Sequence, residues 1–271
     1  MKRIITILSL ISLVSESLFA KTPGKSVSTK TVKSPSVKDT LYLKIEKDDA
    51  IFFTGGNMYI IQAESISSAG NMLYFAAKDF TADKDLIVKK IGKIELKVDK
   101  PERKVVKITM YLGDKEIDPN YSLEIYSEIR KGMPFLALYS RFIYLGEGIH
   151  KCGINWGLSS PYVRDPYKYY TFPKEGKVIT YRLASKSEEN KIGYAKWLYV
   201  HNGKGVGAGL ICPSMLGKGD DFIFINSVPP EKDLEKNDSC DIFMIFMPIS
   251  KNFKILEKIY NTVAKIEWTF D

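Results

Sequence analysis

Short runs of β-branched and aromatic residues, separated by Gly, Asn and Asp, recur along most of this chain. Runs of this length and composition are typical of β-strands, and the polar clusters between them of turns. The predicted strands cover residues 41–46, 57–64, 72–77, 105–112, 121–130, 134–145, 177–184, 194–200, 205–211, 221–228 and 239–247.

The run YSLEIYSEIR, residues 121–130, has the clearest alternation. Because successive side chains of a strand point to opposite faces, it predicts two distinct faces. One face carries Tyr121, Leu123, Ile125 and Ser127, and the other carries Ser122, Glu124, Tyr126 and Glu128.

A helical period occurs only near the C-terminal end, where the apolar positions are Phe253, Leu256, Ile259, Tyr260 and Val263. Ser250 is a suitable N-cap for a helix that begins near Lys251. About a dozen strands without alternating helices predict an all-β fold, a large antiparallel β-sandwich with one C-terminal helix. We assign residues 39–271 to this single domain.

The N-terminal residues predict an export signal. Lys2 and Arg3 precede the apolar run 4–14, and Ala20 supplies a small residue at the cleavage point. A permanent anchor would need about 20 apolar residues. We therefore expect residues 1–20 to be a signal peptide, no integral membrane segment after its cleavage, and a mature protein in the periplasm or outside the cell.

Residues 21–38 are rich in Lys, Ser and Thr and contain no aromatic residue, which predicts a disordered linker. This linker either is simply solvated or contacts anionic envelope polymers. The whole chain has a formal charge of +8, but residues 1–38 hold seven basic groups and one acid. The remaining 33 basic and 31 acidic groups are nearly balanced, so charge does not indicate a nucleic-acid partner.

The three cysteines, Cys152, Cys212 and Cys240, lie far apart. They allow at most one intramolecular disulfide, whose pairing the spacing does not choose, and buried free thiols are the alternative. Two histidines without metal-spaced neighbours make a metal site improbable, and nothing in the sequence predicts a cofactor.

Alternate glycines in the run GKGVGAG, residues 203–209, lack the spacing of a phosphate-binding loop. In a strand they would strip one face of side chains, so that a bulky aromatic residue or a ligand ring approaches the backbone. We expect packing to be the main cause.

Two aromatic segments are candidate ligand sites. The run PYVRDPYKYYTFP, residues 161–173, predicts a long loop that offers Arg164, Asp165 and Tyr167. Flat apolar rings and planar charged groups are what sugar recognition requires, but the same aromatic residues would also pin a loop to the sandwich.

In the second segment Trp197, Tyr199 and His201 share one face of a predicted strand. They form a candidate binding platform, and a core tryptophan is the alternative. Of the acidic residues, Glu124 with Glu128 and Glu188 with Glu189 are possible carboxylate pairs, and we expect them to be solvated. Without a G-x-S-x-G elbow, an α/β-hydrolase is excluded.

From Tyr121 to Tyr260 the order of features resembles the galactose mutarotase-like β-sandwich family. The resemblance rests on LEIYSEIRKGMPFLALYSRFIYL, the aromatic loop, AKWLYVHNGKGVGAGLICP, SCDIFMIFMP and the closing helix. That family contains aldose epimerases, domains of polysaccharide lyases and glycoside hydrolases, and noncatalytic sugar binders. The resemblance implies that His201 could stand in for a catalytic acid, but His201 precedes Asn202 where the family has Asn before His.

This departure favours binding over catalysis. We therefore predict an exported carbohydrate-binding β-sandwich that recognises an oligo- or polysaccharide. Its candidate ligand-binding residues are Trp197, Tyr199, His201, Arg164, Asp165 and Tyr167. The alternatives are a carbohydrate-active enzyme of the same fold and a noncatalytic structural envelope protein.

Overall fold

The computed structural model describes residues 41–45, 50–54, 57–62, 65–69, 71–114, 119–159, 167–183, 191–193, 195–204, 207–211, 216–218, 223–226, 231–249, 253–263, 266 and 268. The described elements belong to one unit, Ser36–Asp271. Within them, 19 strands form one hydrogen-bonded network, and all strand pairs whose register is given are antiparallel. The predicted signal peptide and linker, residues 1–38, lie outside the described residues.

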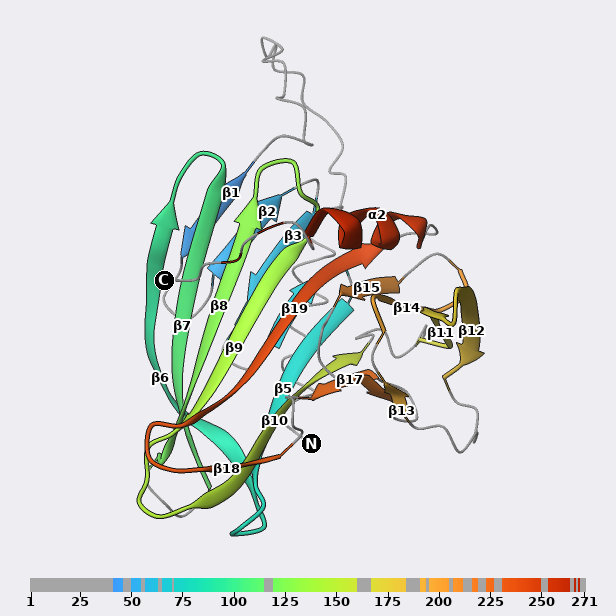
Figure 1. The fold of residues 1–271 in the computed structure, drawn as a ribbon. Coiled ribbons are helices and arrows are strands. Elements are labelled where there is room, and N and C mark those ends of the chain that lie inside the picture. Colours follow the sequence, from blue (N-terminus) through green and yellow to red (C-terminus); the bar gives the residue numbers. More distant parts are fainter. Residues whose placement is uncertain are drawn as a thin grey trace, which may run out of the picture. The chain divides into compact units, whose positions relative to one another are not determined.

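The network folds into two sheets that pack face to face as a β-sandwich (Figure 1). The first sheet contains β1 (Tyr42–Ile45), β2 (Ala50–Thr54), β3 (Asn57–Ile61), β4 (Ser65–Ser68), β5 (Asn71–Asp79), β10 (His150–Ser159), β17 (Ile223–Asn226), β16 (Leu216–Lys218) and β13 (Lys191–Gly193), with β18 (Lys232–Leu234) beside the start of β10.

The second sheet contains β6 (Lys84–Asp99), β7 (Arg103–Gly113), β8 (Tyr121–Arg130), β9 (Leu136–Tyr144), β19 (Ser239–Ile249), β15 (Gly207–Ile211), β14 (Leu198–His201), β11 (Tyr169–Lys174) and β12 (Lys177–Arg182). β6 joins the sheets, because its first residues pair with β5 and the rest pair with β7. The antiparallel β-sandwich predicted from the sequence is thereby confirmed.

The main core fills the space between the two sheets. Its largest fully buried side chains include Trp156 and Tyr59 from the first sheet and Phe142 and Phe246 from the second. Tyr59 packs edge-on against Phe246 at 6.0 Å, and the Trp156 indole donates to Ser140 Oγ at 3.0 Å across the sheets. These contacts fix how the second sheet sits on the first.

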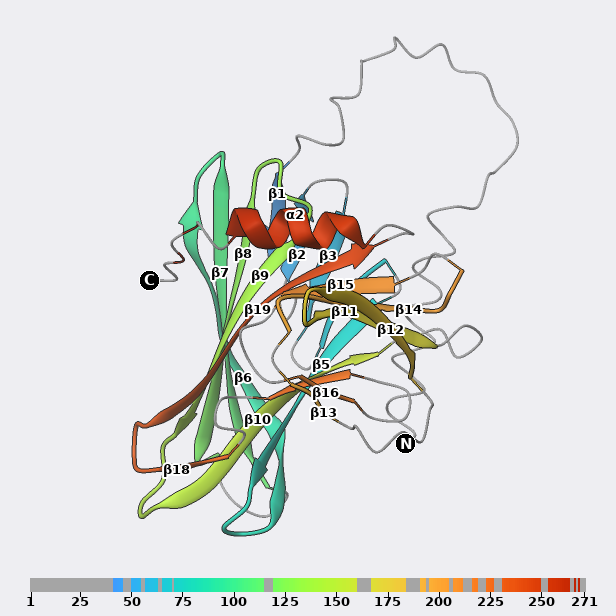
Figure 2. The same ribbon diagram turned by 45° about the vertical axis from the view of Figure 1, so that its right-hand side comes forward.

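A second, smaller core lies on the opposite face of the second sheet, beneath helix α2 (Lys254–Val263). Leu256, Ile259 and Val263 of the helix cover Ile245 and Met247 of β19 and part of β14 and β15 (Figures 1 and 2). The predicted C-terminal helix is confirmed, and its apolar period is explained by this packing, but it begins at Lys254 and not near Lys251. The predicted N-cap, Ser250, lies outside the described residues. We call the side of the second sheet that carries α2 its outer face.

Two long strands were missed by the sequence patterns. β6 shifts register with β7 at three places, and each shift moves the apolar side chains to the other face. In β10, Gly153 and Gly157 weaken the strand signal. A Cβ on Gly157 would collide with the Tyr74 ring, so this glycine makes room for the ring of its cross-strand partner.

The predicted loop 161–173 is wrong at its end, because Tyr169–Lys174 forms strand β11. This strand pairs with both β12 and β14, and its Tyr170 and Phe172 are buried. Tyr170, Thr171 and Phe172 are consecutive and all buried, so β11 is covered on both faces, and this burial explains why the segment forms a strand although Pro173 lies within it.

Candidate functional site

The structure places Trp197 and Tyr199 in the smaller core rather than on an open surface. Both are almost fully buried, with 3% and 4% of their surface exposed. The Trp197 ring stacks on Phe253 at 5.6 Å, just before α2. This burial matches the alternative of a core tryptophan.

His201 lies between two tyrosine rings. It stacks on Tyr199 at 4.6 Å and on Tyr169 at 5.4 Å. The backbone N–H of Gly203 donates to Nδ1 at 3.2 Å, which places the ring hydrogen of the neutral form on Nε2. Burial lowers the pKa of His201, so the ring is neutral at pH 7 and serves as a stacked spacer.

Of the three loop candidates, only Tyr167 falls within the described residues. Its ring is buried, and its hydroxyl donates to Asn71 Oδ1 at 2.5 Å. Burial raises its pKa well above the ordinary value. Arg164 and Asp165 lie outside the described residues.

The glycine-rich run has a packing role, as the sequence led us to expect. On β15 a Cβ at Gly207 would collide with the carbonyl oxygen of Val200 and lie 2.7 Å from the Tyr199 ring. At Gly209 it would collide with Leu256 of α2. The missing side chains let Tyr199 and the helix approach the backbone.

We predict that Gly207→Ala lowers the free energy of unfolding by about 2 kcal/mol, because the clash is with backbone and cannot relax by a rotamer change. Urea unfolding measures the loss. The control is Ala208→Gly, on the neighbouring residue, because it removes a methyl group instead of adding one. Gly176→Ala is not suitable as a control, because the φ of Gly176 is +75°. A Gly207→Ala variant as stable as the parent would contradict the close approach.

The outer face of the second sheet carries a separate set of polar and aromatic residues, on β7, β8, β9 and β19. Strand register places them in two rows that run across the strands. The first row is Thr109, Glu124, Arg141 and Asp241, and the second is Lys107, Tyr126, Tyr139 and Phe243. We call these two rows, together with Trp268, the outer-face platform.

Trp268 lies at the Phe243 end of the second row, which contains most of the aromatic residues of the platform. This indole lies 5.5 Å from the Phe243 ring and 6.4 Å from Phe135. The Arg130 guanidinium lies 4.7 Å from the indole centre, in a cation–π contact. Tyr139, Phe243 and Trp268 are each partly exposed, so their rings remain accessible.

The charged side chains of the two rows pair with one another and with Tyr139. Arg141 Nη2 donates to the Tyr139 hydroxyl at 2.8 Å, and that hydroxyl donates to Asp241 Oδ2 at 3.0 Å. Lys107 Nζ donates to Glu124 Oε1 at 2.5 Å. Glu124 is therefore half-buried and paired, and the expectation that it is solvated is wrong.

Glu128, also expected to be solvated, is fully buried. Arg103 donates to it in a bidentate manner, from Nε at 3.0 Å and from Nη2 at 2.9 Å. Arg130 Nε donates to the same carboxylate at 2.5 Å. Arg130 also contacts Trp268, so Glu128 holds the Arg130 guanidinium at this edge of the platform.

The phenols of the platform are proton donors at neutral pH. Burial raises the pKa of Tyr139, and the charge of Asp241 raises it further. Burial also raises the pKa of Tyr126, which outweighs the opposite effect of Lys107. Tyr139 donates its proton to Asp241 and Tyr126 donates its proton to Glu124, so the platform offers carboxylate acceptors and flat rings but no phenolate base.

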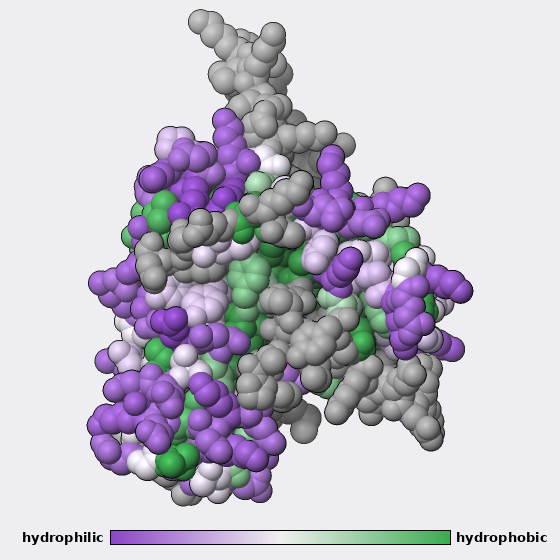
Figure 3. All heavy atoms as spheres, viewed as in Figure 1, coloured by the Kyte–Doolittle hydropathy of each residue, from purple (hydrophilic) through white to green (hydrophobic). Residues whose placement is uncertain are grey.

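In the space-filling view, hydrophilic residues gather over both ends of β6–β9, and a paler band lies between them (Figure 3). The described residues contain no group of three or more His, Cys, Asp or Glu side chains arranged to hold a metal ion. Within the same part of the chain, no helix has the length and apolar character needed to cross a membrane.

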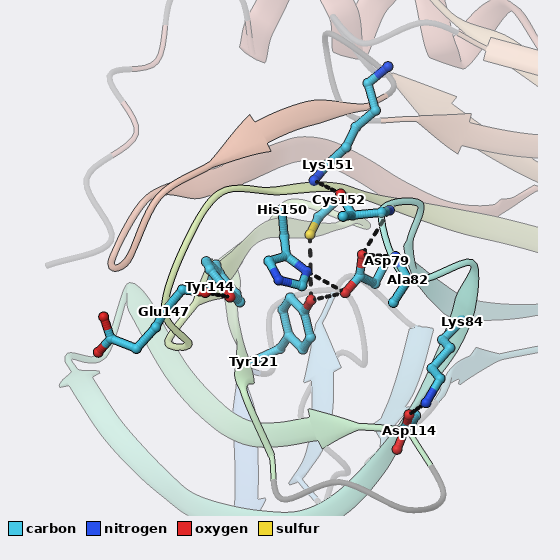
Figure 4. A network of polar contacts seen from close by, with 11 residues as sticks. Asp79, Ala82, Lys84, Asp114, Tyr121, Tyr144, Glu147, His150, Lys151 and Cys152 are labelled. Atoms are coloured by element: carbon cyan, nitrogen blue, oxygen red, sulfur yellow. Dashed lines mark hydrogen bonds and ion pairs between the residues drawn. The ribbon is translucent and has the colours of Figure 1, made fainter.

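A second polar network lies where β5, β8 and β10 meet (Figure 4). Asp79 Oδ2 accepts hydrogen bonds from the Tyr121 hydroxyl at 2.5 Å and from His150 Nδ1 at 2.7 Å. Oδ1 accepts the backbone N–H groups of Thr81 and Ala82 at 2.9 and 3.0 Å. The two backbone bonds hold the turn between β5 and β6, and the bonds from Tyr121 and His150 tie this turn to β8 and β10.

A small pocket of about 80 Å³ adjoins this network. Its lining includes Asp79, Tyr121, His150 and the ion pair of Lys84 with Asp114. This volume holds only a few water molecules. Since every acceptor position of Asp79 is used by the protein itself, we assign the network a structural role.

The sequence patterns did not single out Arg130, Tyr139, Arg141, Asp241 or Trp268. The alternation of residues 121–130 was the one available signal, because it placed Glu124, Tyr126 and Glu128 on a common face. Their partners on β19 are about a hundred residues away in the chain, as with Tyr139 and Asp241 at a separation of 102.

Comparisons with known proteins give no family assignment. No family model matches the chain, and no curated protein matches it. The galactose mutarotase-like resemblance therefore stays a prediction.

Solved structures with a similar arrangement include a GH36 α-galactosidase from Geobacillus stearothermophilus, with 10% identity, a TM-score of 0.47 and coverage of 77% of this chain and 41% of that one. An α-galactosidase from Lactobacillus brevis has 8% identity, a TM-score of 0.46 and coverage of 78% and 40%. Heparan sulfate lyase HepC from Pedobacter heparinus has 10% identity, a TM-score of 0.44 and coverage of 80% and 37%. The chain thus spans about two fifths of the length of these proteins, and likenesses at this level establish no activity.

Proposed function

We propose that this chain is an exported carbohydrate-binding protein that holds an oligo- or polysaccharide on its outer-face platform. The observation that carries the proposal is the row of three partly exposed rings, Tyr139, Phe243 and Trp268, beside the guanidinium groups of Arg130 and Arg141. Export is proposed from the N-terminal sequence alone.

Sugars require this combination of groups. The C–H face of a pyranose packs on a flat apolar ring, and its hydroxyls bond to planar charged groups that can donate or accept in pairs. The Arg141 guanidinium and the Asp241 carboxylate lie beside the Tyr139 ring and supply both kinds of partner. Arg141 Nε makes no hydrogen bond within the described structure, although Asp241 Oδ1 lies 3.6 Å away.

The charges of the platform favour a neutral or weakly charged glycan. Lys107 is paired with Glu124, and Arg141 with Asp241, so neither row presents a block of one sign. A strongly anionic polymer would be recognised by unpaired basic groups. We therefore expect neutral polysaccharides to bind at least as well as acidic ones.

We predict that Trp268→Ala weakens glycan binding about tenfold, the loss expected when one stacked ring is removed. Affinity electrophoresis over a panel of neutral and acidic glycans identifies a ligand and measures the loss. Phe80→Ala is a matched control, because Phe80 is also an exposed aromatic residue but lies on the turn after β5. Equal retardation of the Trp268→Ala variant and the parent would refute the platform.

Intrinsic fluorescence gives an independent readout. Of the three tryptophans, Trp156 and Trp197 are buried and only Trp268 is partly exposed. A glycan that binds the platform should change the emission of the parent and of a Trp197→Phe variant, but not that of Trp268→Ala. The Trp197→Phe variant also tests the ligand-binding role that the sequence predicts for Trp197.

The same panel distinguishes the alternatives. New reducing ends or unsaturated products would make the protein an enzyme, with Glu124 and Asp241 as the carboxylates nearest the platform rings. Absence of binding to any glycan would favour a structural envelope protein.

A further inference from the structure

Two cysteines from opposite sheets meet in the main core. Cys152 lies on β10 of the first sheet and Cys240 on β19 of the second, and both are buried free thiols. Cys240 Sγ lies 3.9 Å from the carbonyl oxygen of Cys152. The Cys240 sulfur is therefore in contact with the backbone of the other cysteine.

The Cys152 thiol has a rotamer that points elsewhere. Its sulfur lies 3.7 Å from the Tyr121 hydroxyl, which in turn donates to Asp79 (Figure 4). A change to another staggered χ1 well would move this sulfur away from Tyr121. The Tyr121 hydroxyl would keep Asp79 as its acceptor, so the move leaves no buried donor without a partner.

We propose that Cys152 and Cys240 form a disulfide between the two sheets when the chain folds in an oxidising environment. The sequence spacing leaves three pairings open, and the structure brings this pair into contact. Cys212 lies outside the described residues and remains the unpaired thiol in this assignment.

The reaction needs a disulfide oxidant, either a small molecule or a dithiol oxidoreductase in its oxidised form. The thiolate of one cysteine attacks the oxidant, which forms a mixed disulfide and expels one thiolate. The second cysteine then attacks the mixed disulfide at the sulfur of the first, which closes the bridge and expels the second thiolate. The two cysteines lose two protons and two electrons, and the oxidant becomes two thiols.

The bond should form before the sheets close. Burial raises the pKa of Cys152 to about 12 and that of Cys240 to about 11, so almost no thiolate exists at neutral pH once the protein is folded. The folded, reduced protein should therefore resist both oxidation and alkylation. This protection separates a bridge made during folding from a reversible surface switch.

The experiment refolds the full chain from denaturant with and without a mixture of reduced and oxidised glutathione. Free thiols are then alkylated in denaturant without reductant, and a non-reduced peptide map locates any crosslink. We expect one alkylated residue, Cys212, and a crosslink between Cys152 and Cys240 in the oxidised sample, against three alkylated residues in the reduced one. The bridge closes a loop with a separation of 88 residues, so the oxidised form should melt about 10 °C higher.

Variants keep the test decisive. Cys212→Ser retains both core cysteines and should give the same crosslink and the same shift in melting temperature. Cys152→Ser and Cys240→Ser should each abolish both, and Cys212→Ser suffices if neither of these variants folds. Three alkylated cysteines after oxidative refolding, or a crosslink that contains Cys212, would overturn the proposal.

Discussion

Replacing Asp79 with Asn should lower the free energy of unfolding by about 3 kcal/mol, because two hydrogen bonds to a buried charged group are lost. Asp79 is the hub of the network in Figure 4, and its carboxylate receives Tyr121 and His150 on one oxygen. The amide oxygen of the Asp79→Asn variant could still accept the backbone N–H groups of the turn. The amide NH₂ of the variant would face the donors of Tyr121 and His150.

The pH dependence of this loss follows from the pKa of Asp79. Burial acts to raise that pKa, but hydrogen bonds from Tyr121, the backbone of Ala82 and His150 outweigh it, so the pKa lies below its ordinary value of 3.8. A carboxyl whose pKa is lower in the folded state stabilises the protein above its unfolded pKa and loses this contribution as the pH falls through the folded value. The difference between parent and variant that comes from the Asp79 carboxylate should be present above about pH 5 and shrink as the pH falls below about 4.

Asp83→Asn is the matched control. Asp83 is on the same turn, pairs with Lys78, and has a side chain that is 86% exposed. Its φ of 52° is one that Asn tolerates. We expect a change within about 0.5 kcal/mol. Urea unfolding at several pH values measures both variants, and equal small losses for the two would show that Asp79 is not a hub.

Most strands of this fold are predictable from local patterns, and the exceptions have physical causes. β8 reads as an alternating strand because one of its faces packs in the main core and the other carries Glu124 and Tyr126 of the platform. β6 does not, since three register shifts break its alternation. In β10, Gly157 makes room for the ring of Tyr74 on the neighbouring strand, and no local sequence pattern reveals this contact.

The site is less predictable than the fold, because exposure is a tertiary property. The alternation of Trp197, Tyr199 and His201 correctly indicates a shared face, yet Phe253 and α2 cover Trp197 and Tyr199. Trp268, in contrast, lies in no periodic segment, and its place in the platform is set by contacts with Arg130 of β8 and Phe243 of β19. A sequence can show which residues share a face, but the covering element decides which face meets a ligand.

Glu128→Gln should also lower the free energy of unfolding by about 3 kcal/mol, the usual result of removing one partner from a buried ion pair. Its carboxylate has no exposed surface and receives donors from Arg103 and Arg130. In the variant these two guanidinium groups face an amide whose NH₂ is itself a donor. Glu147→Gln is the matched control, because its side chain is 84% exposed and paired with Lys236.

The Glu128→Gln variant also links stability to the proposed site. Arg130 is held by Glu128 and lies against the Trp268 indole, so the loss of the carboxylate should alter Trp268 emission and weaken glycan binding. Adding Arg103→Leu to Glu128→Gln removes one of the two guanidinium groups that face the new amide and should recover part of the stability. If the double variant regains stability but not glycan binding, the loss of binding comes from the altered position of Arg130. A Glu128→Gln variant as stable as Glu147→Gln would show that the buried carboxylate does not hold this edge of the platform.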